Sequence, residues 1–231
     1  MPLTPSSSDA ELKPLSVGEV SRTIQSRFSD GGRPLQIVGG RTSLTQLALD
    51  RTPSETLTTT GLTRVIDYPA RDMTITVEAG LRVEELQNLL AEQGQTLPID
   101  IPAARRATIG GAVAANVSGP GRYGYGAFRD YLIGVRAVDG RGRLFAAGGR
   151  VVKNVAGYDL CKLLVGSEGR LAVIAEVTLK VRPLPEARTL VWLTMGDWDA
   201  TEHALDGLTR TQTRPVAIEV VNARAARQLV Q

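Results

Sequence analysis

Apolar residues recur with helical spacing in two stretches of the chain, Ser16–Phe28 and Arg82–Gln93. In the second stretch two glutamates stand in the first turn, apolar residues share one face, and Gly94 follows the last turn. These are typical start and stop signals of an amphipathic helix. We therefore expect a helix over each stretch. The expected buried face of the first helix is Val17, Val20, Ile24 and Phe28.

Runs rich in Val, Ile, Leu and Thr predict strands elsewhere. They are Pro34–Val38, Thr56–Thr60, Thr74–Glu78, Gln95–Pro98, Leu132–Val138, Arg143–Ala147 and Ala172–Val181. The turn signal at 139–142 joins two of them into a hairpin. A polar loop, Lys153–Asp159, leads into a short helix that carries Leu160, Leu163 and Leu164.

The two ends of the chain have a different pattern. Residues 1–14 are rich in Pro and Ser and predict a disordered leader, and Pro183 and Pro185 mark a boundary. Beyond it we expect strands at 189–194 and 216–221, a helix near 201–208 and a helical start up to 231. Such a unit cannot bury its own sheet face. Either the sequence stops inside a second domain, which we favour, or this half-module packs on another protein.

Composition excludes several classes of function. The net charge of +3 comes from scattered arginines, with Arg105-Arg106 the only adjacent pair, whereas a nucleic-acid surface clusters its charge. Cys161 and His203 are the only residues of their kinds, so disulfides and His/Cys metal sites are not expected. We expect an inert thiol at Cys161 and a solvated helix position for His203.

Targeting signals are also missing from the sequence. The N-terminus lacks a basic start and an apolar core, so it does not resemble a signal peptide. No stretch approaches the ~20 apolar residues of a membrane span. The sequence predicts a soluble, cytoplasmic chain without direct membrane insertion, held near a membrane only through partners.

The stretch Ala107–Gly126 is uncharged up to Arg122 and built mostly from small residues. Such backbone lets a flat or extended object approach closely, which predicts the floor of a cofactor site. Within it Gly119–Gly124 fits G-x-G-x-x-G. We reject a Rossmann site, because that motif follows a strand and opens a helix, and because Pro120 removes a needed N–H.

A second glycine motif, Gly39–Ser43, follows the predicted strand 34–38. Its N–H groups, two hydroxyls and Arg41 suit a pyrophosphate, although taken alone an ordinary Gly-Gly turn with a solvated arginine explains the motif better. Three further glycine-containing segments, each at the end of a predicted strand or at the start of a short helix, are Ala79-Gly80, Thr108–Gly111 and Gly166–Gly169. Four such segments together indicate backbone that lines a long ligand.

In this order, the segments Val38–Ser43, Thr76–Gly80, Thr108–Asn116 and Val165–Glu176 resemble the FAD-binding domain of the vanillyl-alcohol oxidase and p-cresol methylhydroxylase (PCMH) superfamily. Across 129–180 the likeness is closest to the FAD-binding subunits of bacterial glycolate oxidases. The resemblance implies an α+β fold: a PCMH-type FAD-binding domain of two α/β subdomains over 15–185. An incomplete α+β cap domain, apparently truncated, would follow over 186–231.

The resemblance also implies which residues bind FAD. The pyrophosphate loop would be Gly39, Gly40, Arg41, Thr42 and Ser43. The segment beside the flavin ring and ribityl chain would be Pro102, Thr108, Gly110, Gly111, Ala114 and Asn116, and the turn and strand at the adenosine end would contribute Gly169 and Ile174. No histidine precedes His203, and a bond through Cys161 would be unusual, so FAD should be non-covalent.

The implied function is oxidation of a 2-hydroxy acid, with glycolate favoured and D-lactate as an alternative. Electrons would leave through partners, a second flavin subunit and an iron–sulfur subunit, because this chain lacks a cluster-binding set of cysteines. No catalytic base can be assigned, since the family places it mainly in the cap. Tyr123, Arg129 and Tyr158 are polar candidates near the ring, but structural roles are favoured for each.

Two alternatives remain open. The chain could be a FAD-binding structural subunit without turnover of its own, or a scaffold of small residues that binds no cofactor. The four ordered motifs argue against the scaffold.

Overall fold

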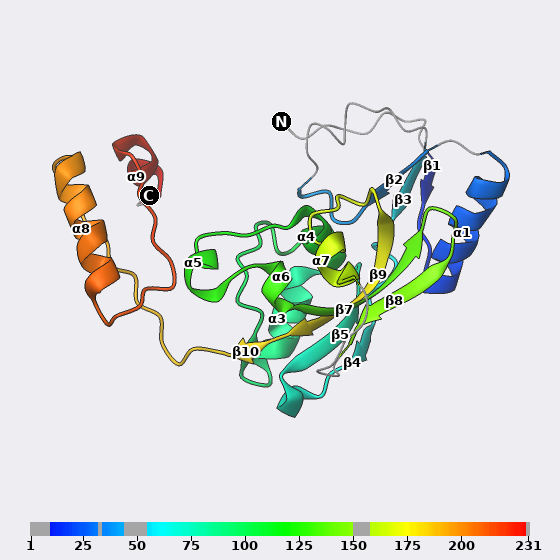
Figure 1. The fold of residues 1–231 in the computed structure, drawn as a ribbon, viewed down its shortest axis with the longest axis horizontal. Helices are drawn as coiled ribbons and strands as arrows, with labels where there is room; N and C mark the ends of the chain where they lie inside the picture. Colours follow the sequence, from blue (N-terminus) through cyan, green and yellow to red (C-terminus); the bar gives the residue numbers. More distant parts are fainter. Residues whose placement is uncertain (1–9, 32–33, 44–54, 150–157, 230–231) are drawn as a thin grey trace.

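The largest element of the fold is an antiparallel five-stranded sheet with the order β4-β5-β9-β7-β8 (Figure 1). The computed structural model describes residues 10–31, 34–43, 55–149 and 158–229. The strands of this sheet are β4 (Val65–Asp67), β5 (Thr74–Glu78), β7 (Leu132–Asp139), β8 (Leu144–Gly148) and β9 (Ala172–Lys180). The predicted hairpin is therefore present as β7 and β8, and β9 lies at the centre of the sheet.

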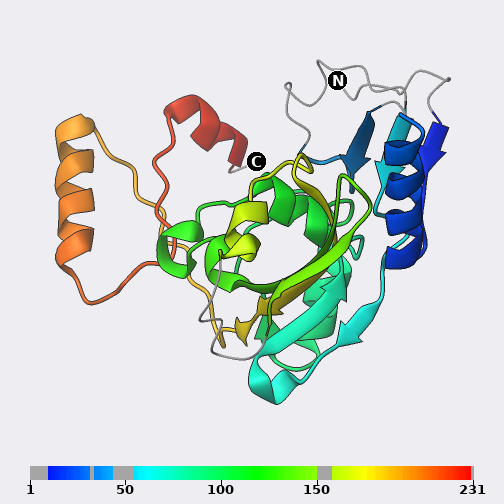
Figure 2. The same ribbon diagram turned by 45° about the vertical axis from the view of Figure 1, so that its right-hand side comes forward.

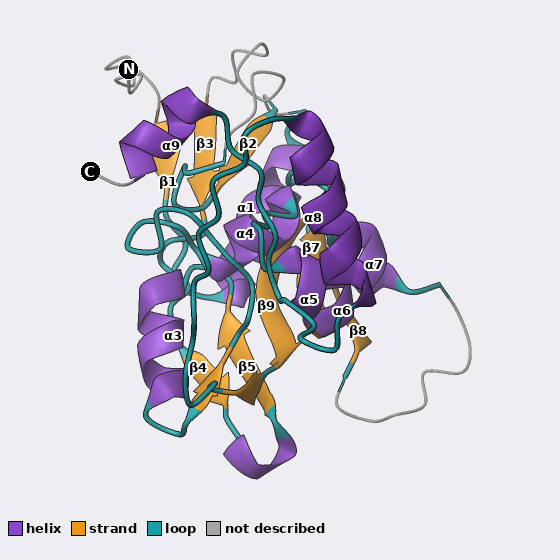
Figure 3. Ribbon diagram, turned by 90° about the vertical axis from the view of Figure 1, so that its left-hand side faces the viewer, coloured by secondary structure: helices purple, strands orange, loops and turns teal. Residues whose placement is uncertain are grey.

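Helices cover one face of this sheet, with α4 packed on β9 and α7 beside β7 and β8 (Figure 3). They are α3 (Val83–Ala91), α4 (Ile109–Ala115), α5 (Arg122–Tyr125), α6 (Phe128–Tyr131) and α7 (Leu160–Leu164), with the 3-10 turn η1 (Ala70–Asp72) at the sheet edge. Their buried side chains, such as Leu86, Leu90 and Phe128, form one core with Ile75, Val77 and other strand residues. Burial of this apolar face holds the helices on the sheet.

A smaller parallel sheet has the order β1-β3-β2 and lies beside α1 (Figure 2). Its strands are β1 (Ala10–Leu12), β3 (Glu55–Thr58) and β2 (Leu35–Val38), and α1 spans Val17–Ser29. The Ser16 hydroxyl caps α1 by accepting a hydrogen bond from the Glu19 N–H at 3.2 Å. A second core joins α1 to this sheet and to Val138, Val173 and Ala175 of the large sheet.

The structure corrects the sequence analysis at two places in this unit. Ala10–Leu12, expected in a disordered leader, forms β1, because it pairs in parallel with Glu55–Leu57 of a distant segment. Residues 1–9 lie outside the described residues. Phe28, expected on the buried face of α1, is exposed, and the Arg141 guanidinium lies 5.7 Å from the centre of its ring.

The C-terminal segment leaves the large sheet after the antiparallel pair β6 (Gln95–Thr96) and β10 (Arg182–Pro183). Its helices α8 (Trp198–Arg210) and α9 (Ala223–Leu229) lie apart from both sheets (Figure 1). The strands expected at 189–194 and 216–221 are wrong, because in the described parts of the chain neither stretch pairs with a strand that would complete a ladder. A link to the body is the hydrogen bond from the Gly124 N–H to the Val216 carbonyl at 2.9 Å.

The α+β class predicted from the sequence is confirmed: α1 covers the parallel sheet, helices cover one face of the five-stranded antiparallel sheet, and β6 and β10 form a separate antiparallel pair. The domain limits at 15, 185 and 186 stay predictions.

Candidate cofactor site

A cavity of about 490 Å³ lies where the two sheets meet. Its walls are β2, the loop 39–43 that follows it, α4, the turn 168–170 and the beginning of β9. The volume falls within the usual range of small-molecule pockets, roughly 300–1,000 Å³. The fold thus brings three segments that are far apart in the sequence, 34–43, 108–115 and 168–174, together with Thr59, to one ligand-sized space, whereas the Ala79-Gly80 segment does not line it.

Most residues expected at a cofactor site line this cavity. They are Gly39, Gly40, Arg41, Thr42, Ser43, Thr108, Gly110, Gly111, Ala114, Gly169 and Ile174. Pro102 and Asn116 do not line it. Pro102 is exposed, and Asn116 ends α4 in the left-handed conformation with φ +50°.

The glycines of the floor are required by contacts of the chain with itself. A Cβ on Gly40 would overlap the Arg106 carbonyl, and one on Gly39 would overlap the Thr108 hydroxyl. A Cβ on Gly110 would stand 2.5 Å from the Ala79 Cβ. The loop 39–43 therefore packs backbone against backbone on the segment that starts α4. Gly111 is less confined, since an added Cβ there would meet chiefly the Thr108 hydroxyl, at 2.9 Å.

The first N–H groups of α4 are already used within the chain. The Ile109 N–H donates to the Leu81 carbonyl at 2.9 Å, and the Gly110 N–H donates to the Ala79 carbonyl at 2.7 Å. The Gly111 N–H donates to the Thr108 hydroxyl at 3.3 Å. The N-terminus of α4 therefore offers these donors to the protein rather than to a ligand.

The loop 39–43 differs in this respect. Among the described residues, none of its main-chain N–H groups donates a hydrogen bond. Arg41 has φ +56°, a left-handed conformation of the kind that turns successive N–H groups toward one side as an anion-binding nest. Its guanidinium forms an exposed pair with Glu11 of β1 at 3.2 Å. This loop therefore combines uncommitted donors with positive charge.

Several residues that the sequence did not indicate also line the cavity. They are Pro34, Leu35, Gln36, Ile37, Val38, Thr59, Ala115, Glu168, Arg170 and Ala172. Arg170 and Glu168 are the charged members of this group, and they pair with each other at 3.4 Å. Their position inside or directly after the Gly166–Gly169 motif could have indicated them.

Cys161 does not line the cavity, and its thiol donates to the Ala147 carbonyl at 3.4 Å. Burial raises the pKa of this thiol to about 11, so it is neutral at ordinary pH and a poor nucleophile. His203 is exposed on α8. Neither the one cysteine nor the one histidine of the chain therefore lines the cavity.

The other polar candidates of the sequence also lie outside the cavity. Tyr158 is exposed, and so is Tyr123, while the Arg129 guanidinium donates to the Lys162 carbonyl at 3.4 Å. Within the described part of the chain, no group of three His, Cys, Asp or Glu residues could hold a metal ion. None of the helices in the described residues combines the length and the apolar character of a membrane span.

The family model described as FAD binding domain matches residues 8–148. The chain is 34% identical over 187 residues to a D-2-hydroxyglutarate dehydrogenase of Xanthomonas citri pv. viticola, covering 81% of this chain and 39% of that protein. It is 36% identical over 155 residues to glycolate oxidase subunit GlcE of Escherichia coli, covering 67% of this chain and 43% of that protein. The chain thus spans less than half the length of these relatives.

Among solved structures, the fold is similar to that of an alkyldihydroxyacetonephosphate synthase, with a TM-score of 0.66 and 25% sequence identity. This likeness covers 77% of the chain and 32% of the synthase.

Proposed function

The chain belongs to the FAD binding domain family, and on this premise we propose that it takes part in the oxidation of a small 2-hydroxy acid, with glycolate as the favoured substrate. FAD is the cofactor of this family. The chain provides no histidine or cysteine among the described residues that line the cavity, which fits a non-covalent FAD.

The observation that carries the proposal is the cavity between the loop 39–43 and the turn 168–170. Its uncommitted N–H groups and its arginines suit a diphosphate, while Gly111 and Ala114 leave a small-residue surface for a flat ring. We assign the FAD-binding role to the residues expected from the sequence that line this cavity. Pro102 and Asn116, which do not line the cavity, remain predicted members of the site.

Bound FAD would accept a hydride from the carbon that bears the substrate hydroxyl. In this proposal the residues of the chain bind and orient the cofactor: the loop 39–43 fixes the diphosphate, and α4 fixes the ring. The catalytic base is not assigned to any residue of the chain.

Names of the relatives support both the substrate class and an assembly. They include glycolate oxidase subunits of Escherichia coli and Bacillus subtilis, and a D-lactate dehydrogenase of Archaeoglobus fulgidus. We propose that electrons pass from FAD to a second flavin subunit and an iron–sulfur subunit. The iron–sulfur subunit and the cytoplasmic location stay predictions from the sequence.

The second candidate function is a FAD-binding structural subunit without turnover of its own. The exposed apolar side chains of the C-terminal segment favour it, since they suit packing against another polypeptide. An alternative within the first candidate is a different 2-hydroxy acid, such as D-lactate.

Anaerobic addition of glycolate to the FAD-loaded chain separates these candidates. Bleaching of the flavin absorption is expected for the enzyme, and D-lactate and D-2-hydroxyglutarate in parallel samples identify the preferred acid. A flavin that stays oxidised with all three acids contradicts turnover by this chain and favours the structural subunit.

The Gly111→Val variant tests the placement of the ring. Added bulk at this position should reduce flavin occupancy more than it reduces stability, because an added Cβ meets chiefly one hydroxyl, at 2.9 Å, rather than backbone as at Gly40. Full occupancy in this variant would contradict the placement.

A further inference from the structure

Two arginines line the cavity, and only Arg41 belongs to the motif that suggested a diphosphate. The second is Arg170, in the turn that leads into β9. We infer that Arg170 is a further cofactor-binding residue, whose guanidinium pairs with the FAD diphosphate together with the loop 39–43. This inference rests on the proposed cofactor site.

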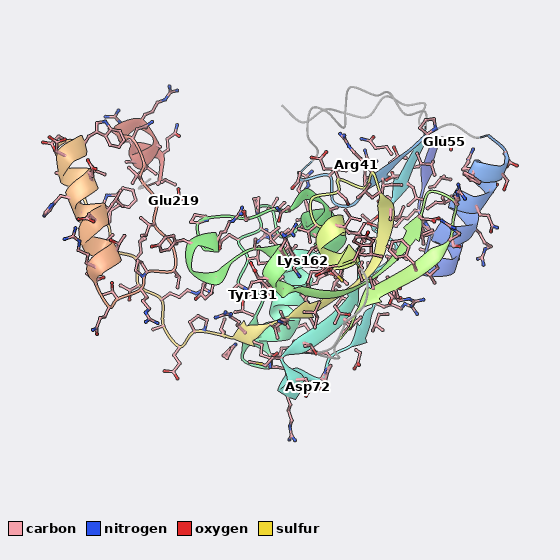
Figure 4. All side chains as sticks on the ribbon, viewed as in Figure 1. Arg41, Glu55, Asp72, Tyr131, Lys162 and Glu219 are labelled. Atoms are coloured by element: carbon pink, nitrogen blue, oxygen red, sulfur yellow. The ribbon has the colours of Figure 1, made fainter. Side chains whose placement is uncertain are left out.

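The turn that carries Arg170 lies directly against β2, the strand that leads into the loop 39–43. Gly169 adopts φ +73°, and a Cβ there would lie 3.1 Å from the Ile37 Cβ. Arg41 lies beyond the end of β2, on the side of the molecule where β9 begins (Figure 4). The two arginines therefore reach one cavity from neighbouring segments.

The main-chain N–H groups of this turn are largely committed within the chain. The Gly166 and Glu168 N–H groups donate to the carbonyls of Val113 and Ala114, at 3.1 and 2.9 Å. The Ser167 N–H donates to the Leu164 carbonyl and the Arg170 N–H to the Ser167 carbonyl. What the turn offers to an anion is therefore the Arg170 side chain.

The present partner of Arg170 is a weak competitor for that side chain. The pair with Glu168 is 3.4 Å long, and the arginine side chain is 54% exposed. Exposed pairs of this kind contribute little, whereas a guanidinium binds phosphate oxygens through two parallel hydrogen bonds. Exchange of the carboxylate for a diphosphate is therefore favourable. Arg41, paired with Glu11 at 3.2 Å, is in the same situation.

The test is the dissociation constant of FAD for the full chain, measured by flavin fluorescence at several salt concentrations. Arg170→Gln should weaken FAD binding about tenfold or more, as expected for loss of a hydrogen bond to a charged group. It should also flatten the dependence on salt, because one charge contact is lost. Arg170→Lys, which keeps the charge but not the paired geometry, should restore part of the affinity and of the salt dependence.

Two further variants complete the design. Arg210→Gln, which removes an arginine paired with Asp206 on α8, should leave the dissociation constant of FAD and its salt dependence unchanged. Glu168→Gln, which removes the competing carboxylate, should tighten binding.

An Arg170→Gln variant that binds FAD as the unmodified chain does would overturn the inference and leave the proposed function intact. Weaker binding with an unchanged salt dependence would also overturn it, since that result indicates a structural role of the turn. If the unmodified chain bound no FAD, the proposed function itself would fail.

Discussion

The floor of the cavity and the C-terminal segment 186–229 differ in how side-chain size matches the surroundings. In the floor, Gly39, Gly40 and Gly110 lie where a Cβ would collide with neighbouring atoms of the chain. In the C-terminal segment, large apolar side chains are exposed, Leu190 at 85% and Trp198 at 78%. The first region is fitted by contacts within the chain, whereas the second has apolar surface that the described chain does not cover.

This difference shows that the structural role of a glycine or of an apolar run depends on the residues that pack against it. A glycine is required where two backbones touch, and an apolar run becomes a strand only where another strand completes its hydrogen bonds.

The largest effect is expected from Gly40→Ala. The new Cβ would overlap the Arg106 carbonyl, and backbone cannot move aside as a side chain can. We expect a loss of about 2–3 kcal/mol in the free energy of unfolding, as for overpacking of a dense core. Urea denaturation measures it.

Gly140→Ala is the matched control, because a Cβ at this position in the hairpin turn would meet no atom of the described residues within 4 Å. It should be neutral or stabilise by up to about 1 kcal/mol. Equal losses in the two variants would contradict the packing role of the floor.

Binding of FAD is expected to raise the free energy of unfolding by about as much as Gly40→Ala lowers it. If FAD binds only the folded chain, a concentration 100 times its dissociation constant adds about 2.7 kcal/mol of stability. For a chain of this length the melting temperature should rise by roughly 5–10 °C. Thermal melting with and without FAD measures it, and riboflavin, which lacks the diphosphate, should give a smaller shift. An unchanged melting temperature with saturating FAD would count against the site.

A smaller, pH-dependent effect is expected from Cys161, which lies in the core that covers the large sheet. Burial raises the pKa of its thiol from 9.0 to about 11. The unfolded chain therefore loses the thiol proton at lower pH than the folded chain, and this contribution to stability is full below pH 9 and lost as pH rises toward 11. The Cys161→Ala variant should lack this part of the decline in an alkaline urea series.

Iodoacetamide gives a second measurement on the same thiol. Labelling of Cys161 in the folded chain at pH 8 should be slow and should accelerate on addition of urea. Rapid labelling of the folded chain would contradict the burial.

The smallest effect is expected in the C-terminal segment. Leu190→Ser removes an exposed apolar side chain and should change stability by less than about 0.5 kcal/mol. Thermal melting measures it. A loss above about 1 kcal/mol would show that the Leu190 side chain is packed in the folded chain. It would contradict the claim that the C-terminal segment, unlike the floor of the cavity, has uncovered apolar surface.

Much of the fold could be predicted from the sequence because periodicity reports burial. The Arg82–Gln93 pattern gave α3, and the Ala172–Val181 run gave β9, since both bury their apolar residues. The short strand β1 could not be predicted, because its three residues depend on pairing with a distant segment. For the same reason the apolar runs at 189–194 and 216–221 predicted strands that are absent.

The sequence predicted where the site lies better than it predicted the packing contacts and hydrogen bonds inside the site. Three of the four glycine motifs contribute residues to the cavity and Ala79-Gly80 does not, and the contact of Gly40 with Arg106 depends on tertiary structure. Likewise, the sequence does not show that the N–H groups of α4 are already used, or that Arg170 faces the same cavity as Arg41. Cofactor-binding properties that depend on such contacts can therefore be recognised only in the folded structure.

The central claim is that this cavity holds FAD without a covalent bond. The most direct measurement is the visible absorption spectrum of the chain after incubation with FAD and gel filtration, followed by acid precipitation. We predict a flavin band that elutes with the protein and is released into the supernatant by acid. A colourless protein would contradict the claim that FAD binds, and colour retained in the acid pellet would contradict the claim that it binds non-covalently.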